Sequence, residues 1–181
     1  MVSCAPMVGV TNRHWRYLIR LLAKRATLWT PMFVARRVAL RKRHVAEEML
    51  RFHPDERPPV VQLGGDDPKM VLAAGRRCQE MGFAEVNLNL GCPARNAQAG
   101  NHGAMLMRPP HTAAVAVLKA LTSELSVPVS AKVRIGVDEH DSYGFFRDFI
   151  QCLHEDGGCK SFVVHARRAL LSGLPEGYKG G

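Results

Sequence analysis

The sequence predicts an α/β fold of the TIM (β/α)8-barrel type that is incomplete, with about six of the eight βα units present. Short apolar, β-branched segments alternate with amphipathic helical segments at intervals of roughly 25–40 residues, which indicates βα units around a parallel sheet. Polar residues follow the predicted strands, at Gln62, Asn87, Asn89, Cys92, Lys132, Arg134 and His165. Because at least four strands contribute, a barrel is favoured over a doubly wound sheet, which gathers its functional residues at one switch point.

Six segments are predicted to be strands because they are short, apolar and rich in β-branched residues. They are 2–6, 28–34, 60–63, 85–90, 127–133 and 161–165. A complete barrel has eight strands, so the seventh and eighth are expected to be absent from this chain.

Two of the intervening helices have recognisable ends. One is predicted to begin at Pro68 with Asp67 as its N-cap and to end at Gly82. Its apolar stripe is formed by Val71, Ala74, Cys78 and Met81. The other is predicted to open at Ser142 and to close at Gly157-Gly158, with a stripe formed by Phe146, Phe149, Ile150 and Leu153.

The segment 86–93 predicts a buried strand that ends in a glycine turn carrying Cys92. Side chains alternate along a strand, so Asn87 and Asn89 share one face and the apolar residues share the other. Buried amides need hydrogen-bonding partners, and the predicted partner is a bound cofactor or substrate. For Cys92 itself, a purely structural role in the turn remains an alternative. The following segment, 93–110, is rich in small and polar residues and is predicted to be a long, mobile loop without regular structure.

The formal charge of +9 over 181 residues favours a polyanionic partner such as nucleic acid. The densest basic run, 36–44, is also typical of a solvated helix face. Five cysteines without a CxxC pair argue against a disulfide framework or a zinc site and fit a reducing compartment. No apolar run approaches the ~20 residues that cross a bilayer, and the first residues do not resemble a signal peptide. A cytoplasmic protein without membrane segments or metal is therefore predicted.

Five motifs occur in a fixed order: 5–13 (APMVGVTNR), 61–65 (VQLGG), 87–93 (NLNLGCP), 132–136 (KVRIG) and 163–167 (VVHAR). In this order and spacing they resemble the tRNA-dihydrouridine synthases. The likeness is greatest to the A-type group, because of Gly64-Gly65 and the stretch 136–143. It extends over positions 3 to 173.

The resemblance implies reduction of a uridine in tRNA to 5,6-dihydrouridine by an enzyme that carries FMN and is reduced by NADPH. A uridine flipped out of the tRNA would accept hydride at C6 from the reduced flavin. Cys92 corresponds to the acid of the family and would protonate C5. Asn89 corresponds to the amide that holds the uracil edge, and Arg167 would also contact the tRNA substrate.

The resemblance also implies a flavin site, made of Ala5, Pro6, Met7, Gln62, Lys132 and His165. The first three would line the isoalloxazine ring with backbone contacts, and Gln62 would hydrogen-bond its polar edge. Lys132 would provide a fixed cation that stabilises the reduced flavin, and His165 would reach the ribityl chain or the phosphate. Without the resemblance, each of three residues could have a purely structural role: Lys132 in a salt bridge, His165 as a hydrogen-bonded core histidine, and Gln62 as a polar residue that caps a strand end.

Family members have two further strands, whose loops form the flavin phosphate site, and a C-terminal helical domain that binds tRNA. Neither is found in 1–181, so the chain is expected to be a partial FMN-binding catalytic domain. Two other functions remain open: an aldolase-type barrel with Lys132 as a Schiff-base lysine, and a non-catalytic remnant that binds tRNA. The oligomeric state is not predicted.

Overall fold

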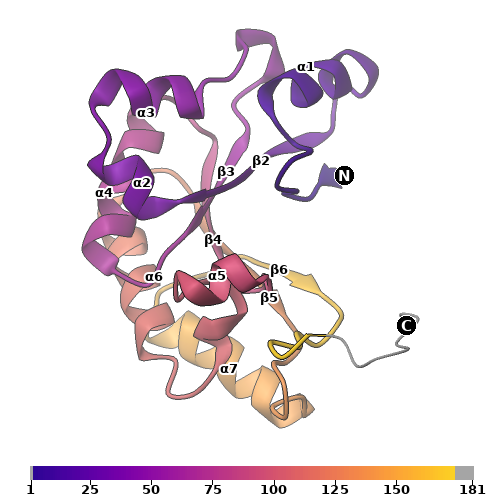
Figure 1. Ribbon diagram of the computed structural model, residues 1–181, viewed down its shortest axis with the longest axis vertical. Helices are drawn as coiled ribbons and strands as arrows, with labels where there is room; N and C mark the ends of the chain where they lie inside the picture. The colour runs from indigo at the N-terminus through magenta and orange to yellow at the C-terminus, as the bar shows by residue number, and fades with distance from the viewer. Residues whose placement is uncertain (1, 174–181) are drawn as a thin grey trace.

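The computed structural model describes residues 2–173, in which six parallel strands form one curved sheet (Figure 1). The strands follow one another in the sheet in chain order: β1 (Ser3–Cys4), β2 (Thr27–Val34), β3 (Val60–Gly64), β4 (Glu85–Asn89), β5 (Val129–Arg134) and β6 (Phe162–His165). Sequential parallel pairing is the topology of a barrel, and here β1 and β6 are the two edges. The predicted fold class, an incomplete barrel of six βα units, is confirmed.

Helices connect the strands, and several of them cover the outer face of the sheet. They are α1 (Arg13–Leu22), α2 (Ala35–Leu40), α3 (Arg43–Leu50), α4 (Pro68–Glu80), α5 (Arg95–Ala99), α6 (Thr112–Glu124) and α7 (Tyr143–Glu155), with two short 3₁₀ helices, η1 (Pro54–Glu56) and η2 (Gly103–Met107). In chain order α2 packs against α4, α4 against α6, and α6 against α7, so these helices form one continuous outer layer (Figure 1).

The predicted caps explain where two of these helices start. The carboxylate of Asp67 accepts hydrogen bonds from the N–H groups of Lys69 (2.8 Å) and Met70 (3.3 Å), and Pro68 occupies the first position of α4. The hydroxyl of Ser142 accepts from the N–H of Phe145 (3.1 Å) and caps α7. These side chains satisfy amide groups that have no partner inside the first turn of a helix.

The core lies between the sheet and the outer helices. On β4, Val86 and Leu88 point into this layer, followed by Leu90, and all three are fully buried. Cys78 on α4 is part of the same core, where burial raises the pKa of its thiol to about 12. A thiol with so high a pKa is inert at neutral pH, so Cys78 is a packing residue.

The segment 93–110 differs from the prediction, because it contains α5 and η2 and is therefore not a structureless loop. Its apolar residues are buried in spite of the small and polar composition: Ala97, Ala104, Leu106 and Met107. The basic side chains of the run 36–44 are exposed as expected, but the run spans two helices, since α2 ends at Leu40 and α3 begins at Arg43.

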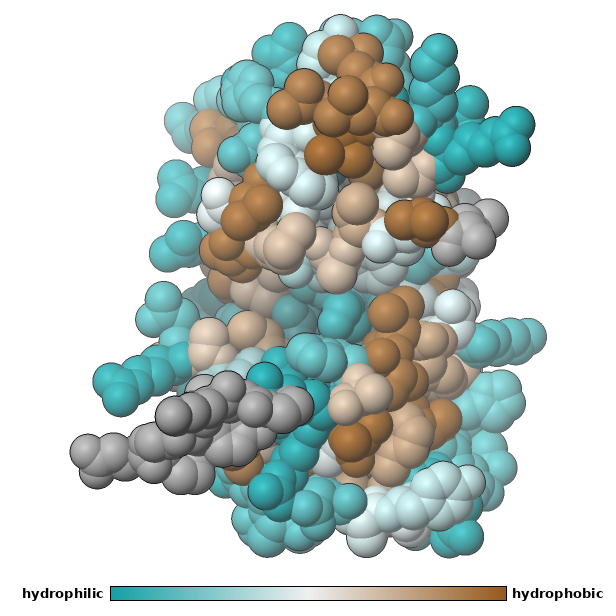
Figure 2. Space-filling view, turned by 90° about the vertical axis from the view of Figure 1, so that its right-hand side faces the viewer, coloured by the Kyte–Doolittle hydropathy of each residue, from teal (hydrophilic) through white to brown (hydrophobic). Residues whose placement is uncertain are grey.

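Both edges of the sheet carry exposed apolar side chains. Val163 and Val164 on β6 are 37% and 44% exposed, and Leu18, Leu21 and Leu22 are exposed on α1 beside the other edge. Figure 2, which faces the side of the molecule where both edges lie, shows apolar areas separated by polar ones. None of the helices within 2–173 has the length and apolar character needed to span a membrane.

We expect residues 1–181 on their own to self-associate at micromolar concentration, because an unpaired strand edge with apolar side chains is a template for pairing with another chain. Replacing Val164 by Lys at the β6 edge should reduce this association, as measured by sedimentation velocity. Tyr143→Lys is the control, because Tyr143 is more exposed (79%) but begins α7, away from the edge strands. A chain that remains monomeric at 100 micromolar, on the order of the concentrations at which exposed edges associate, would contradict this expectation.

Candidate functional site

A pocket of about 280 Å³ lies at the carboxyl ends of the strands. It is lined by Pro6, Val8, Met32, Gln62, Asn89, Gly91, Cys92, Pro93, Lys132, Arg134 and His165. Six of the predicted site residues are therefore brought together from five strands and the segments that follow them. Ala5, Met7 and Arg167 do not line the pocket, although Arg167 is close enough for its charge to lower the pKa of Arg134.

The backbone around Cys92 is held from several sides. The N–H groups of Gly91 and Cys92 both donate to Asn89 Oδ1, at 3.1 Å and 3.0 Å. The carbonyl of Cys92 accepts from the N–H of Ala104 at the start of η2 (2.9 Å), and that of Gly91 accepts from Arg134 Nε (2.8 Å). The turn therefore places the thiol at the pocket through hydrogen bonds to β4, β5 and η2.

Gly103 permits the close approach of η2 to this turn. Its φ is +71°, a left-handed conformation that disfavours residues with a Cβ. A Cβ at this position would lie only 2.5 Å from the carbonyl oxygen of Cys92. The segment after Cys92 thus combines a glycine with buried apolar residues and packs directly on the turn.

The two amides on β4 have different surroundings. Asn87 is fully buried and bonds to Gln62 and Ser130, so the prediction of a cofactor or substrate as its partner is wrong. Those partners belong to β3 and β5, where register places Gln62 and Ser130 directly beside Asn87. Asn89 bonds to Gln62 and also lines the pocket, where its amide can meet a ligand.

Positive charge dominates the pocket. This charge comes from Lys132 and Arg134, and no carboxylate is among the described residues that line the pocket. Burial lowers the pKa of Lys132, and the Arg134 charge lowers it further, whereas the Cys92 side chain acts in the opposite direction. Burial followed by the Arg134, Lys132 and Arg167 charges also lowers the pKa of His165. Crowded cations without a carboxylate favour the binding of an anionic ligand.

This crowding gives a prediction for Lys132→Met. Because the pKa of Lys132 is lower in the folded chain than in the unfolded chain, its charge destabilises the fold at neutral pH. The substitution should therefore raise the free energy of unfolding, measured with urea, in the absence of ligand. The gain should shrink as pH rises from the lowered pKa through the ordinary lysine pKa, where both states become neutral. A variant that is less stable than the unsubstituted chain at pH 7 would contradict this electrostatic account.

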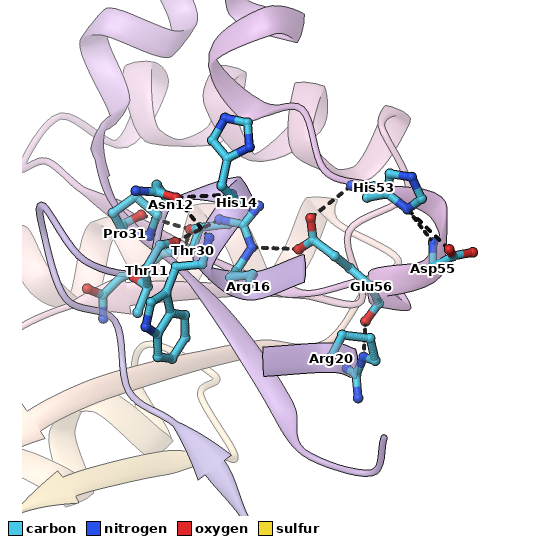
Figure 3. Close-up of polar contacts among 12 residues, drawn as sticks. Thr11, Asn12, His14, Arg16, Arg20, Thr30, Pro31, His53, Asp55 and Glu56 are labelled. Atoms are coloured by element: carbon cyan, nitrogen blue, oxygen red, sulfur yellow. Dashed lines mark hydrogen bonds and ion pairs between the residues drawn. The ribbon is translucent and has the colours of Figure 1, made fainter. Parts of the chain in front are cut away.

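The loop after β1, which provides Pro6 and Val8, is anchored by a buried ion pair (Figure 3). Arg16 Nε lies 2.7 Å from Glu56 Oε2, and the two side chains are 2% and 0% exposed. Arg16 also donates to the carbonyl of Thr11 (2.8 Å), whose hydroxyl in turn bonds to the backbone of Met7. This pair therefore connects η1 to the loop that forms one wall of the pocket.

Sequence reasoning missed several residues of this region. The sequence places Arg134 at the end of a strand but assigns it no role in the site, although period-two alternation puts it on the same strand face as Lys132. Met32 lines the pocket because β2 pairs with β3 in a register that places it beside Gln62, and a single sequence does not reveal this register. The Arg16–Glu56 ion pair joins residues far apart in the chain, and nothing in the sequence beyond their opposite charges indicates that they pair.

Two further features concern the thiols of the chain and its possible metal ligands. All five cysteines are free thiols. Within 2–173 there is no group of three His, Cys, Asp or Glu side chains placed so that it could hold a metal ion.

Comparison with known proteins assigns the chain to a family. Residues 3–176 match the family model described as dihydrouridine synthase (Dus). Among curated relatives, a tRNA-dihydrouridine(20/20a) synthase of Vibrio parahaemolyticus is 41% identical over 96% of this chain and 52% of its own length. Proteins of the same name from Synechocystis sp. and Pasteurella multocida are 41% and 42% identical over 96% and 95% of this chain, and over 50% and 51% of their own lengths.

The chain spans about half the length of the curated relatives that it matches. The match nevertheless includes all six strands and every residue that lines the pocket. The resemblance seen in the five ordered motifs is confirmed, and the chain belongs to the dihydrouridine synthase family.

Proposed function

We propose that this chain provides the flavin-binding and uridine-binding half of an enzyme that reduces a uridine in tRNA to 5,6-dihydrouridine, with NADPH as the reductant. The observation that carries the proposal is the cationic pocket in which Cys92, Asn89, Gln62, Lys132 and His165 come together. Family membership supports the reaction class. The cysteine, the amides and the cations provide an acid, groups that can recognise a pyrimidine edge, and a binding site for an anion.

The residues of the pocket fit FMN. Gln62 and Asn89 offer amide groups that can bond the polar edge of an isoalloxazine, and the lysine, arginine and histidine match its anionic phosphate or its reduced ring. Pro6, Val8 and Met32 add an apolar wall. Ala5 and Met7 flank this wall and stay proposed as flavin contacts through their backbone. FMN supplies, when bound, the hydride that reaches C6 of the uracil ring.

Cys92 is proposed to protonate C5. Its thiol gives its proton to C5 when a hydride is added at C6, and the thiolate is reprotonated by solvent, so one hydride and one proton are added across the double bond. Lys132 and Arg134 lie close enough for their charges to interact with Cys92, and they would stabilise the thiolate that forms. Asn89 accepts a hydrogen bond from the N–H of Cys92 through its Oδ1 and is proposed to offer its NH2 group to the uracil edge.

Transfer RNA is the proposed partner, and the cytoplasm is the proposed location. The charge of +9 supports binding to a polyanion, and the exposed residues Arg36, Arg37, Arg41 and Lys42 are suited to phosphate contacts. Arg167, next to the pocket but outside its lining, is proposed to contact the tRNA near the flipped uridine. The aldolase alternative is set aside because the chain belongs to the dihydrouridine synthase family.

Binding of FMN should depend on the pocket and not on the basic run 36–44. We expect Lys132→Ala to weaken FMN roughly 10- to 100-fold, the usual range for loss of a hydrogen bond to a charged group, and Gln62→Ala to weaken it less. Arg41→Ala, which removes an exposed charge on the outer face, is the matched control and should leave FMN affinity unchanged. Fluorescence titration of FMN measures this in a hybrid protein, in which residues 3–176 replace the matching segment of the Vibrio parahaemolyticus relative. Equal losses in Lys132→Ala and Arg41→Ala would place the flavin elsewhere.

The same Arg41→Ala variant should weaken tRNA binding. The slope of log tRNA affinity against log salt concentration should become smaller in magnitude by about 0.7–0.9, because one phosphate contact and its released counterion are lost.

The proposed function is tested most simply by colour. We expect a hybrid, in which residues 3–176 replace the matching segment of the Vibrio parahaemolyticus relative, to purify with the visible absorption bands of flavin. Residues 1–181 alone are expected to bind flavin weakly or not at all and to leave tRNA unreduced. A colourless hybrid that folds and binds tRNA would support the alternative of a non-catalytic RNA-binding protein.

A further inference from the structure

Five polar side chains form a continuous line of hydrogen bonds across three neighbouring strands. The line begins at Glu85, the first residue of β4, and ends at the turn that carries Cys92. Its members are, in order, Glu85, Ser130, Asn87, Gln62 and Asn89. The last four are at most 8% exposed. Only Gln62 and Asn89 line the pocket, so the other three residues need a separate explanation.

At the rim of the barrel, the line begins with backbone donors. The N–H groups of Gly91 and Cys92 donate to Asn89 Oδ1, which leaves the NH2 group of Asn89 to donate to Gln62 Oε1 at 3.0 Å. The oxygen atoms of both amides are thus engaged as acceptors.

Toward the base of the barrel, the line continues in the same direction. Gln62 Nε2 donates to Asn87 Oδ1 at 2.8 Å, and Asn87 Nδ2 donates to Ser130 Oγ at 2.7 Å. The hydroxyl of Ser130 donates to the carboxylate of Glu85. Each group is an acceptor from one neighbour and a donor to the next.

The two ends fix this direction. A backbone N–H can only donate, and a carboxylate can only accept, so each amide between them has one orientation that satisfies both of its neighbours. Turning any one amide by 180° would place two donors or two acceptors face to face in a buried position. A buried polar group without a partner is unfavourable, so the ends restrain the orientation of every amide in the line.

We propose that Glu85, Ser130 and Asn87 are positioning residues that set which atoms of Gln62 and Asn89 face the pocket and that hold the Cys92 turn through Asn89. The NH2 groups of Gln62 and Asn89 each use one hydrogen in the line, and the other hydrogen stays available to a ligand. The consequence for the reaction rests on the proposed function. The direction of the hydrogen bonds in the line does not rest on that function, because the donors and acceptors of the protein alone determine it.

Ser130→Ala is the most informative change. It leaves Asn87 Nδ2 without an acceptor and Glu85 without a donor, so the restraint on the Asn87, Gln62 and Asn89 amides is lost at the base. Ser130→Thr keeps a hydroxyl and should restore the restraint. Glu85→Gln retains an oxygen that can accept from Ser130, whereas Glu85→Leu does not, so these two variants repeat the comparison at the partly exposed end of the line.

The test is hydrogen exchange of the Gly91 and Cys92 N–H groups, followed at residue resolution by mass spectrometry on the full 181-residue chain at submicromolar concentration, below the range in which we expect it to self-associate. We expect exchange to be about 10-fold faster in Ser130→Ala and in Glu85→Leu, the effect of weakening one hydrogen bond. Ser130→Thr and Glu85→Gln should exchange like the unsubstituted chain.

Thr122→Val is the matched control, because the Thr122 hydroxyl also donates to a partly buried acceptor, the carbonyl of Gly157 (2.9 Å), but lies on α6 away from the line. It should leave exchange at Gly91 and Cys92 unchanged. The proposal is overturned if Ser130→Ala and Glu85→Leu leave this exchange unchanged, or if Thr122→Val accelerates it equally. Neither flavin nor tRNA is needed, so a failure of the proposed function would not alter the outcome.

Discussion

Replacing Cys92 by Ala in the hybrid protein should lower dihydrouridine formation in tRNA by roughly 10²–10⁴-fold, the usual contribution of a positioned general acid. FMN binding and NADPH oxidation should be nearly unchanged, because the thiol is proposed to act only when C5 of the uridine is protonated. The backbone of residue 92 is held by Asn89 and Ala104, so alanine should keep the turn intact. Dihydrouridine is measured by mass spectrometry of nucleosides from digested tRNA.

The control for this variant is Cys152→Ala. Cys152 is a partly exposed thiol on α7, outside the pocket, and its loss should leave dihydrouridine formation unchanged. If Cys92→Ala retained the full rate, Cys92 would be a structural residue of the turn and the acid would have to be another group.

Replacing Glu56 by Gln should cost about 3–5 kcal/mol of unfolding free energy, the usual effect of removing one partner of a buried ion pair. The carboxylate accepts from Arg16 and from the N–H of His53 (2.8 Å), and the amide of glutamine cannot accept at both of its ends. The guanidinium of Arg16, 2% exposed, would be left without a compensating charge. Because Arg16 also holds the carbonyl of Thr11, the loop after β1 should loosen and FMN affinity should fall.

Glu47→Gln provides the comparison, since the Arg43–Glu47 pair has a similar separation (2.8 Å) but is 76% and 46% exposed. Its loss should change the free energy of unfolding far less, because an exposed ion pair is screened by solvent. Urea denaturation of both variants measures the difference. A loss below about 1 kcal/mol in Glu56→Gln would indicate that the Arg16–Glu56 pair is solvated or replaceable, contrary to its burial.

Local chemistry could be predicted from the sequence because it depends on neighbouring residues. The Asp67 cap of α4 and the Ser142 cap of α7 follow from residue type and spacing, and both are confirmed. The strand predicted at 85–90 agrees with β4 to within one residue, since alternation is strong there. By contrast, β1 comprises only Ser3–Cys4 of the predicted 2–6, because pairing with β2 decides its length.

Contacts between distant segments could not be predicted in the same way. The segment 93–110 looks like a loop by composition, but Gly103 and the buried residues of η2 pack it on the Cys92 turn. Asn87 was expected to meet a ligand, and strand register gives it Gln62 and Ser130 instead. The site residues that share the pocket lie near strand ends, where alternation and barrel topology are informative. The role of each one remains a prediction.

The central claim is that this chain carries the acid, amides and cations of a dihydrouridine synthase. It is tested most directly by incubating unmodified tRNA with the hybrid protein, FMN and NADPH in D2O and by analysing the nucleosides. We predict dihydrouridine with deuterium at C5, delivered from the exchangeable thiol of Cys92; the hydrogen on N5 of reduced flavin also exchanges with solvent, so the isotope at C6 is not part of the test. A hybrid that binds FMN and oxidises NADPH but forms no dihydrouridine, or that forms it without deuterium at C5, would contradict the claim.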